Sequence, residues 1–425
     1  MTPDGWKEVL LGEIVDLRMG GTPARKEPLY WDREKSTQNR WVAISDMKQR
    51  LLRETSEYIS DEGIKNSPVK LIEAGTPLMS FKLTIGKATI PAVPVYTNEA
   101  IVALEPTGPI DRVFLYYAIP RVAKTATASV AVKGKTLNKE KLRQLPVLLP
   151  PLREQRKIAA ILSSVDEVTE KTEAVVAQLQ IVKSAITREL LTRGMPGRHS
   201  RYKQTEIGSI PEDWRVVTIG ELLRMGVLED VQDGNHGAQH PKAADFVSSG
   251  IPFVMARDLR FGTVDLSSCS FITRKQADGL RIGFARPGDV LLSHKGTVGR
   301  TAVVPDGHDY MMMTPQVTYY RIGNPDLLAT QYLYHLMQGP EFQRQLDARS
   351  RQSTRSYIGI TKQRELLVPL PDLSEQIEIG RAVAAVEARL VAEEAVLEDL
   401  LSLKAAVMSV LLTGDVRVAP NGEAG

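Results

Sequence analysis

The 425-residue sequence has a single cysteine, Cys269, so it can form no internal disulfide and no cysteine-rich zinc site. It has no apolar run near the roughly 18 residues that a membrane-spanning helix needs. Its first residues lack the basic start, apolar core and small-residue cleavage site of a secretory signal. These absences predict a cytoplasmic protein without a membrane segment.

A large excess of one charge is also absent, because the chain has 54 Lys and Arg and 51 Asp and Glu, which gives a net charge of +3. A net charge this small does not identify a nucleic-acid-binding protein. The charge is unevenly distributed, since residues 1–150 carry 22 basic and 17 acidic side chains and residues 373–425 carry 4 and 9. We expect the acidic C-terminal stretch to face a protein partner or solvent rather than a phosphate backbone.

What the sequence does contain is an internal repeat. SFKLTIGK (80–87) returns as SHKGTVGR (293–300), and GWKEVLLGEI (5–14) returns as DWRVVTIGEL (213–222). In each repeat, short strand-like runs punctuated by Gly and Pro are followed by a short helical run, which is typical of an α+β domain. The repeat predicts two bodies of similar fold.

A long helix is predicted to follow each body. LPVLLPPLREQ (145–155) returns as LLVPLPDLSEQ (366–376), and the offset then stays at 221 residues for about forty residues. Positions three and four apart are apolar in eight of ten cases in both segments, which is a heptad pattern. We expect the helices to pack on each other along a seam that contains Val165, Val175, Leu179, Ile186, Val386, Val396, Leu400 and Val407.

The connection between the repeats favours antiparallel helices. A helix over residues 155–192 is about 57 Å long at 1.5 Å per residue. Parallel packing would require residues 193–213 to return that whole length, although they reach at most about 70 Å when fully stretched. We therefore predict an α+β protein with two similar mixed α/β domains, separated by an antiparallel two-helix coiled coil with pseudo-twofold symmetry.

The same pattern predicts the domain boundaries. These are a first body at 1–151, a first spacer helix at 152–192, a linker at 193–207, a second body at 208–372, a second spacer helix at 373–413 and a flexible tail at 414–425. Two related bodies on a helical rod suit two short segments of one DNA duplex, because equivalent grooves recur every 34–36 Å or so.

The duplicated motifs resemble those of a known family. The W…LGE opening, the GD(V)LLS-x-K-x-T-x-G-(K/R) element and the LP-x-L-x-EQ start of the helix together look like the specificity (S) subunit of type I restriction–modification enzymes. The first repeat departs from the pattern at Thr76–Pro77, where the second has Asp289–Val290, and at Leu83, where the second has Gly296.

The resemblance implies that each body is a target recognition domain that reads one half of a bipartite, interrupted target in double-stranded DNA. It implies that the helices set the distance between the half-sites and dock the methyltransferase (M) subunits, two per S subunit, with restriction (R) subunits in the full complex. It also implies no catalytic site and no cofactor in this chain, with S-adenosylmethionine, ATP and Mg²⁺ held by the partner subunits.

Two alternatives are a stand-alone sequence-specific DNA-binding scaffold and the recognition part of a self-contained restriction enzyme. An enzyme would need nucleotide, metal or cofactor motifs. Gly86–Lys87 is followed by Ala88 rather than Ser or Thr, so this stretch is not a Walker loop. NPDL (324–327) lacks the second proline and the aromatic residue of a methyltransferase motif.

Basic side chains at repeated places are the first candidates for DNA contact. Either they are exposed turns and solvated faces, or they contact phosphates. The candidates in the repeated hairpin are Lys82, Lys87, Lys295 and Arg300. Those in the basic stretch before each long helix are Lys133, Lys135, Arg349, Arg351 and Arg355.

Loops after the opening motif are the second group of candidates. The Gly-rich loop GNHGAQHPK offers Asn235, His236, Gln239 and Lys242, whose side-chain types read base edges, and no third ligand accompanies its two histidines to form a metal site. A disordered loop is the alternative. Arg25 and Lys26 occupy the corresponding place in the first body.

Overall fold

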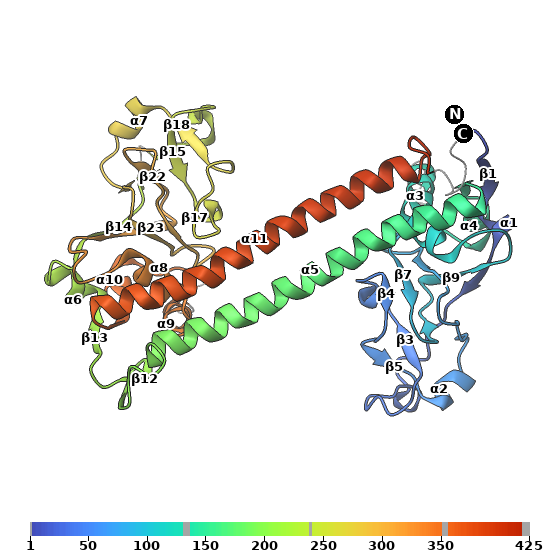
Figure 1. Ribbon diagram of the computed structural model, residues 1–425, viewed down its shortest axis with the longest axis horizontal. Helices are drawn as coiled ribbons and strands as arrows, with labels where there is room; N and C mark the ends of the chain where they lie inside the picture. Colours follow the sequence, from blue (N-terminus) through green and yellow to red (C-terminus); the bar gives the residue numbers. More distant parts are fainter. Residues whose placement is uncertain (1, 131–136, 238–239, 351–355, 419–425) are drawn as a thin grey trace. The chain divides into compact units, whose positions relative to one another are not determined.

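The chain divides into two compact units. The structure, a computed structural model, describes residues 2–130, 137–237, 240–350 and 356–418. Unit 1 comprises Met1–Glu173 and Val396–Gly425, and unit 2 comprises Ala174–Ala395. Both division points fall inside the long helices rather than at their ends, so each unit holds one body together with part of each long helix (Figure 1).

The body of unit 1 is built on two sheets. The larger sheet has the strand order β2 (Val15–Met19), β9 (Ile101–Pro106), β6 (Leu78–Ser80), β7 (Ala88–Pro91) and β4 (Leu51–Leu52). The smaller has the order β5 (Glu57–Tyr58), β3 (Arg40–Val42) and β8 (Tyr96–Thr97). A separate pair joins β1 (Lys7–Leu10) to β10 (Pro146–Leu149). The short helices are α1 (Leu11–Ile14), η1 (Pro28–Tyr30), η2 (Ile44–Asp46), α2 (Asp61–Lys65), α3 (Arg112–Val130) and α4 (Lys139–Arg143).

Unit 2 repeats this topology with additions. Its larger sheet has the order β14 (Leu228–Asp233), β23 (Val317–Ile322), β20 (Val290–Ser293), β21 (Thr301–Val303), β17 (Thr263–Val264) and β16 (Leu259–Arg260). The smaller has the order β18 (Ser270–Ile272), β15 (Ile251–Val254), β22 (Met311–Met313) and β19 (Phe284–Ala285). A pair joins β13 (Arg215–Thr218) to β24 (Leu367–Leu370). The short helices are α6 (Ile219–Arg224), η3 (Ala243–Asp245), η4 (Ala256–Asp258), α7 (Arg274–Asp278), α8 (Thr330–Gln338), α9 (Pro340–Ser350) and α10 (Ile360–Gln363). The strands of unit 2 without a counterpart in unit 1 are β16, β19 and the hairpin of β11 (Tyr202–Thr205) and β12 (Gly208–Pro211). The predicted similarity of the two bodies is confirmed.

Two long helices, α5 (Leu152–Arg193) and α11 (Leu373–Leu411), follow the bodies. Proline precedes each helix, and α5 contains neither Gly nor Pro. It stops before Gly194, whose φ of +76° is a left-handed conformation that suits a helix C-terminus. Inside α11, a Cβ on Gly380 would lie 3.3 Å from the Cβ of Gln331, so glycine lets this helix approach α8 closely.

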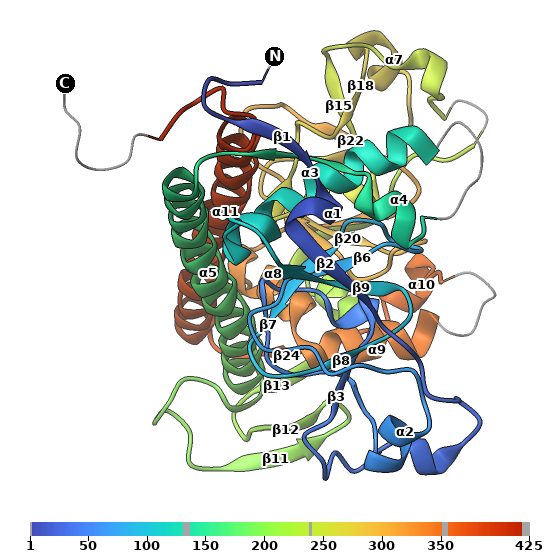
Figure 2. The ribbon, with the colours of Figure 1, turned by 90° about the vertical axis from the view of Figure 1, so that its right-hand side faces the viewer.

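The helices run antiparallel within each unit (Figures 1 and 2). In unit 2, Gln180 of α5 donates to Glu394 of α11 at 3.4 Å, and further along α5 Lys183 pairs with Glu387 at 2.6 Å. Residue numbers therefore rise along one helix as they fall along the other. In unit 1 the beginning of α5 shares an apolar core with the end of α11, around Leu411. The predicted antiparallel arrangement is confirmed.

The same ion pair is made in both units by equivalent residues. Asp166 pairs with Lys404 at 2.6 Å in unit 1, as Glu387 does with Lys183 in unit 2. Each acid lies 221 positions from the other acid, and each lysine 221 positions from the other lysine. A lysine of one repeat's helix thus meets the acid of the other repeat's helix in both places.

Each acid also binds a tyrosine of its own body. The hydroxyl of Tyr117 in α3 donates to Asp166 at 2.6 Å, and that of Tyr334 in α8 donates to Glu387 at 3.1 Å. The body helix and both long helices therefore meet at one carboxylate. This arrangement ties each body to the helical pair through polar bonds as well as apolar packing.

The predicted apolar seam is displaced by about one residue. Val175 and Val396 are 42% and 47% exposed, and the other six predicted seam residues are only half-buried. The buried line lies one position later and includes polar side chains, namely Leu162, Asp166, Thr169, Val176, Thr187 and Leu190 on α5, with Val383, Leu390 and Leu411 on α11. A pattern of apolar residues alone does not predict this buried line, because paired charges and threonines occupy part of it.

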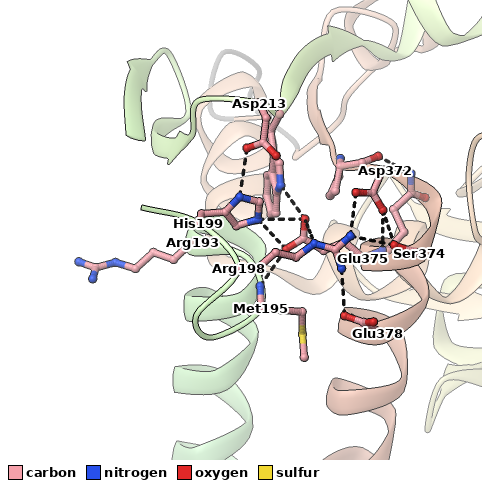
Figure 3. Close-up of polar contacts among 12 residues, drawn as sticks. Arg193, Met195, Arg198, His199, Asp213, Asp372, Ser374, Glu375 and Glu378 are labelled. Atoms are coloured by element: carbon pink, nitrogen blue, oxygen red, sulfur yellow. Dashed lines mark hydrogen bonds and ion pairs between the residues drawn. The ribbon is translucent and has the colours of Figure 1, made fainter. Parts of the chain in front are cut away.

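A buried glutamate fastens the start of α11 (Figure 3). The indole of Trp214 donates to Glu375 at 2.9 Å, and the backbone N–H of Met195, just after α5, donates to it at 2.9 Å. His199 Nε2 lies 2.8 Å from the same carboxylate, and Arg198 reaches Asp372 at 2.8 Å. The segment that follows α5 is thereby fixed to the first turn of α11.

Glu154 fastens the start of α5 in the same way. It accepts from Trp6 at 3.0 Å and from two nitrogens of Arg417 at 2.9 Å each. Burial opposes its ionisation, but hydrogen bonds from Arg417 and Trp6 outweigh that effect and lower the pKa of Glu154. The segment that follows α11 is thus fixed to the first turn of α5.

The glutamine beside each glutamate has its own repeated role. The side-chain oxygen of Gln155 accepts from the N–H of Asp111, and its amide donates to Pro109 and Pro150. Gln376 makes the same set of bonds, to Ala329, Leu327 and Pro371. The EQ motif therefore holds the loop that precedes α3 or α8 against the start of the long helix.

Two segments outside the bodies and long helices have structure of their own. The predicted linker (193–207) contains strand β11 (Tyr202–Thr205), which forms a hairpin with β12 (Gly208–Pro211). The predicted flexible tail (414–425) is anchored at its beginning, because Arg417 binds Glu154. Residues 419–425 lie outside the described part of the chain.

The Lys183–Glu387 pair predicts a charge-dependent stability. Lys183→Glu places two carboxylates together where the side chains are only 20% and 17% exposed, so we expect a loss of about 2 kcal/mol in the free energy of unfolding. The exchange K183E/E387K should recover at least half of that loss in urea titrations. Arg193→Glu, at the exposed Glu189–Arg193 pair, should cost less than about 0.5 kcal/mol. Equal losses in all three variants would contradict this account.

Candidate nucleic-acid interface

The repeated SFKLTIGK and SHKGTVGR stretches form equivalent hairpin loops. Ser80 accepts on its hydroxyl from the N–H of Lys87 at 3.0 Å, and Ser293 accepts from Arg300 at 2.9 Å. The loop between each pair protrudes from the larger sheet, between β6 and β7 or between β20 and β21. The serine is required because it closes the base of the loop.

The glycine in each loop is required by the backbone. Gly86 and Gly299 have φ of +88° and +97°, which a residue with a side chain rarely adopts. Both donate their N–H to the serine carbonyl at 2.9 Å. The Ser and Gly residues of the motif are therefore explained by loop geometry before any ligand is considered.

The basic residue at the end of each loop is bonded to the body. Lys87 Nζ donates to the carbonyl of Ile44 at 3.3 Å, and Arg300 donates to that of Ala256 at 3.4 Å. Of the other two predicted residues, Lys82 is half-buried with its ammonium 5.4 Å from the Phe81 ring. Lys295, at the equivalent position of the unit 2 loop, is exposed.

The basic stretch before α11 is only partly described. Arg349 is half-buried, and it donates to the carbonyls of Gln345 and Glu365 at 3.3 and 3.4 Å, so two of its N–H donors are used within the body. The other predicted residues of these stretches, Lys133, Lys135, Arg351 and Arg355, lie outside the described residues.

The Gly-rich loop after β14 contradicts one prediction. Asn235 is 4% exposed and its N–H donates to Met313 at 2.8 Å, so its side chain is not offered to a DNA groove. The prediction failed because Gly234 and Gly283 let the loop pass against β22, which buries the asparagine. His236 and Lys242 are exposed, and Gln239 lies outside the described residues.

Arg25 is built into an aromatic cluster of unit 1. Its guanidinium lies 4.0 Å from the ring centre of Trp31 and 4.7 Å from that of Trp41, and it pairs with Glu57 at 3.0 Å. The side chain remains 52% exposed. Lys26, which follows it, is exposed. A flat cation held on aromatic rings is suited to contact with phosphates or bases.

Sequence reasoning missed a basic cluster in unit 2. Arg260 donates to the carbonyl of Arg257 at 3.1 Å, and Arg300 approaches the same carbonyl at 3.5 Å. Two guanidinium groups therefore meet at one backbone carbonyl of η4. Only spatial proximity reveals this, because Arg300 lies more than forty positions away in the sequence.

It also missed the roles of Glu154, Glu375 and the two ion pairs of the helices. Their signal was present, since each of these residues has a partner of the same charge at the constant offset of 221. Within the described residues, no group of three or more His, Cys, Asp or Glu is arranged to hold a metal ion. In the same part of the chain, no helix is long and apolar enough to cross a membrane.

Comparison with known proteins agrees with this arrangement. Residues 3–180 match the type I restriction modification DNA specificity domain. The chain is 23% identical to the type I restriction enzyme MjaVIII specificity subunit of Methanocaldococcus jannaschii, over 98% of this chain and 94% of that protein. Residues 3–180 are thus similar to that domain, and the chain as a whole is similar to a type I restriction enzyme specificity subunit.

Solved structures of specificity subunits share its fold. The crystal structure of the S subunit from M. genitalium matches with a TM-score of 0.61 at 13% identity, over 96% of both chains. A chain from a structural study of complex assembly and conformational transition in a type I R-M system matches with a TM-score of 0.54 at 18% identity, over 98% of this chain and 100% of that chain.

Two buried histidines predict a pH dependence in unit 2. Burial lowers the pKa of His294, in the repeated hairpin, and of His335, in α8, to about 4. In the unfolded chain, where a histidine pKa is near 6.5, both side chains are easier to protonate than in the folded unit. Their contribution to the free energy of unfolding is therefore complete above about pH 6.5 and is lost as the pH falls toward 4. The unfolding midpoint of unit 2 should fall over this range.

A matched variant isolates His294. Repeat one has Phe81 and Val102 where repeat two has His294 and its bonding partner Thr318. H294F/T318V should therefore reduce the slope of the unfolding midpoint against pH between 6.5 and 4, leaving the contribution of His335. Circular dichroism melts at several pH values measure this. An unchanged slope would show that His294 does not titrate with unfolding.

Proposed function

We propose that this chain reads DNA for a type I restriction–modification enzyme, with each body recognising one half of a bipartite, interrupted target. The observation that carries the proposal is the duplication of one body topology, with the same hairpin and a basic residue at the same place in each. Two like readers on one chain suit two short segments of one duplex.

The exposed cations supply the chemistry of binding. Lys295, Arg300 and Lys242 in unit 2, with Arg25 and Lys26 in unit 1, contact phosphates and base edges in this proposal. Since Arg25 is held against Trp31 and Arg300 against η4, these guanidinium groups are positioned before DNA arrives. Fixed donors lose less conformational entropy on binding than mobile ones.

Selection from a random DNA library tests the proposal. The full-length chain, purified with its methyltransferase subunits, should enrich a motif of two defined segments separated by a gap of constant length. Two bodies that read separate half-sites require such a gap. A single continuous motif, or no enrichment, would contradict the proposal.

The long helices set the gap in this proposal. Each unit fixes both helices through a partly buried ion pair and a buried glutamate, so neither helix can slide on the other without breaking contacts in both units. Chemistry on the DNA then belongs to the partners: two M subunits that bind S-adenosylmethionine, and R subunits that use ATP and Mg²⁺. This chain contributes no catalytic group.

The outward faces of the helices are the proposed docking surface for the M subunits. Ile181 on α5 is 64% exposed and lies about 200° around the helix from Lys183, which faces α11. Leu401 and Leu403 on α11 are 49% and 50% exposed. Large apolar side chains on a surface helix are typical of protein contacts.

Substitution at Ile181 tests this docking surface. Ile181→Glu adds a charge to an exposed position, so the fold should melt as the wild type does, but the M subunits should no longer co-purify. Gln178→Glu adds the same charge to an exposed polar position of the same helix and should leave co-purification unchanged. Retention of the M subunits by I181E would contradict the assignment of this face.

A further inference from the structure

Strained backbone occurs at two exposed apolar residues, one in each unit. Among the described residues, non-glycine φ angles are positive only at Lys35, Leu83 and Phe261. Lys35 is held by a bond from its ammonium to the Thr55 carbonyl at 3.0 Å. Leu83 and Phe261 have no such explanation, since their side chains are 94% and 67% exposed.

Phe261 forms the tip of the β16–β17 hairpin. The two-residue turn between Arg260 and Thr263 consists of Phe261 and Gly262, with φ of +52° and +76°. Turns of this kind favour Asn-Gly, because asparagine tolerates a left-handed backbone far better than an aromatic residue does. Phenylalanine in this conformation is strained, and its exposed side chain recovers little of that strain energy by burial.

Basic groups frame Phe261. Arg260 precedes it, and the carbonyl of Arg257 lies within 3.5 Å of donors from both Arg260 and Arg300. The side chain of Arg257 is itself 60% exposed. Arg260 and Arg300 line the same hollow as Phe261, together with Lys183 of α5 and Glu387 and Glu394 of α11. The exposed ring therefore lies near two guanidinium groups that can meet an anionic partner.

Leu83 has the corresponding character in unit 1. It lies three positions after Ser80 with φ of +61°, and the residue three positions after Ser293 is Gly296 with φ of +77°. The second repeat thus uses glycine for the same backbone shape. Leucine adds strain and an exposed side chain, and Lys82 lies beside it.

We propose that Phe261 and Leu83 are apolar contacts to DNA bases, one for each half of the target, flanked by cations that bind the phosphates. The inference rests on the proposed function and names residues that contribute to its specificity. Apolar side chains contact thymine methyl groups or insert between base pairs, and neither contact needs a hydrogen bond from the side chain. Strain at an exposed residue is then retained because the side chain acts outside the protein.

Two substitutions separate this role from a structural one. F261N introduces the favoured Asn-Gly turn, and L83G introduces the residue that the second repeat already carries. Both relieve strain, so melting temperatures should equal or exceed that of the wild type. In library selection with the full-length chain and its M subunits, each variant should lose base preference in one half of the motif, a different half for each, and bind the wild-type target at least about fivefold more weakly.

Conservative variants and modified DNA complete the test. F261Y and L83M keep the large side chain and should retain the wild-type motif. Replacing thymine by uracil in the affected half-site removes the methyl group, and 2-aminopurine fluorescence reports a base that has left the stack. Weaker binding to the uracil-containing DNA supports a direct contact to the thymine methyl group. A rise in 2-aminopurine fluorescence that F261N or L83G abolishes supports insertion between base pairs.

Several results would overturn the inference. One is the same motif and affinity in F261N and L83G as in the wild type; another is a lower melting temperature, which would show that the side chains stabilise the fold. Loss of M subunits with unchanged DNA selection would assign the residues to a protein contact instead. If the wild type itself enriches no bipartite motif, the proposed function fails, and that outcome is distinguishable from failure of the inference alone.

Discussion

A carboxylate in an apolar setting must be fully bonded, and Glu154 and Glu375 each meet this requirement with partners from two other parts of the chain. Each binds the indole of its own body and the segment that follows the other repeat's helix. Leaving such a charge unpaired would cost several kcal/mol. A unit is therefore complete only when its body, the start of one long helix and the end of the other are all in place.

The paired charges on the helices extend the same constraint. Since Asp166–Lys404 and Glu387–Lys183 are equivalent positions of the two repeats, one register satisfies both units at once. Tyr117 and Tyr334 bring the bodies into the same arrangement. In the proposed function, this is how two DNA readers are held so that the half-sites must be a fixed distance apart.

The sequence allowed the repeat, the α+β bodies, the long helices and their antiparallel direction to be predicted, because all of these depend on periodicity and chain length. It did not locate the buried line of the helices, where Asp166 and Thr169 replace apolar residues. Nor did it show that Asn235 is buried or that Arg417 returns to Glu154, since both depend on contacts distant in sequence. Phe261 could not be singled out from the sequence for another reason, because only its positive φ angle marks it as unusual.

The central claim is that the two long helices fix the distance between the two half-sites. Inserting seven residues after Glu173 in α5 and seven after Ala395 in α11 leaves the contacts within each unit intact, because both insertions lie at the unit boundary. Seven residues add about 10.5 Å of helix, which is about three base pairs at 3.4 Å each. Library selection should then return the same two half-sites with a gap longer by about three base pairs. An unchanged gap, or altered half-sites with the gap preserved, would contradict the account.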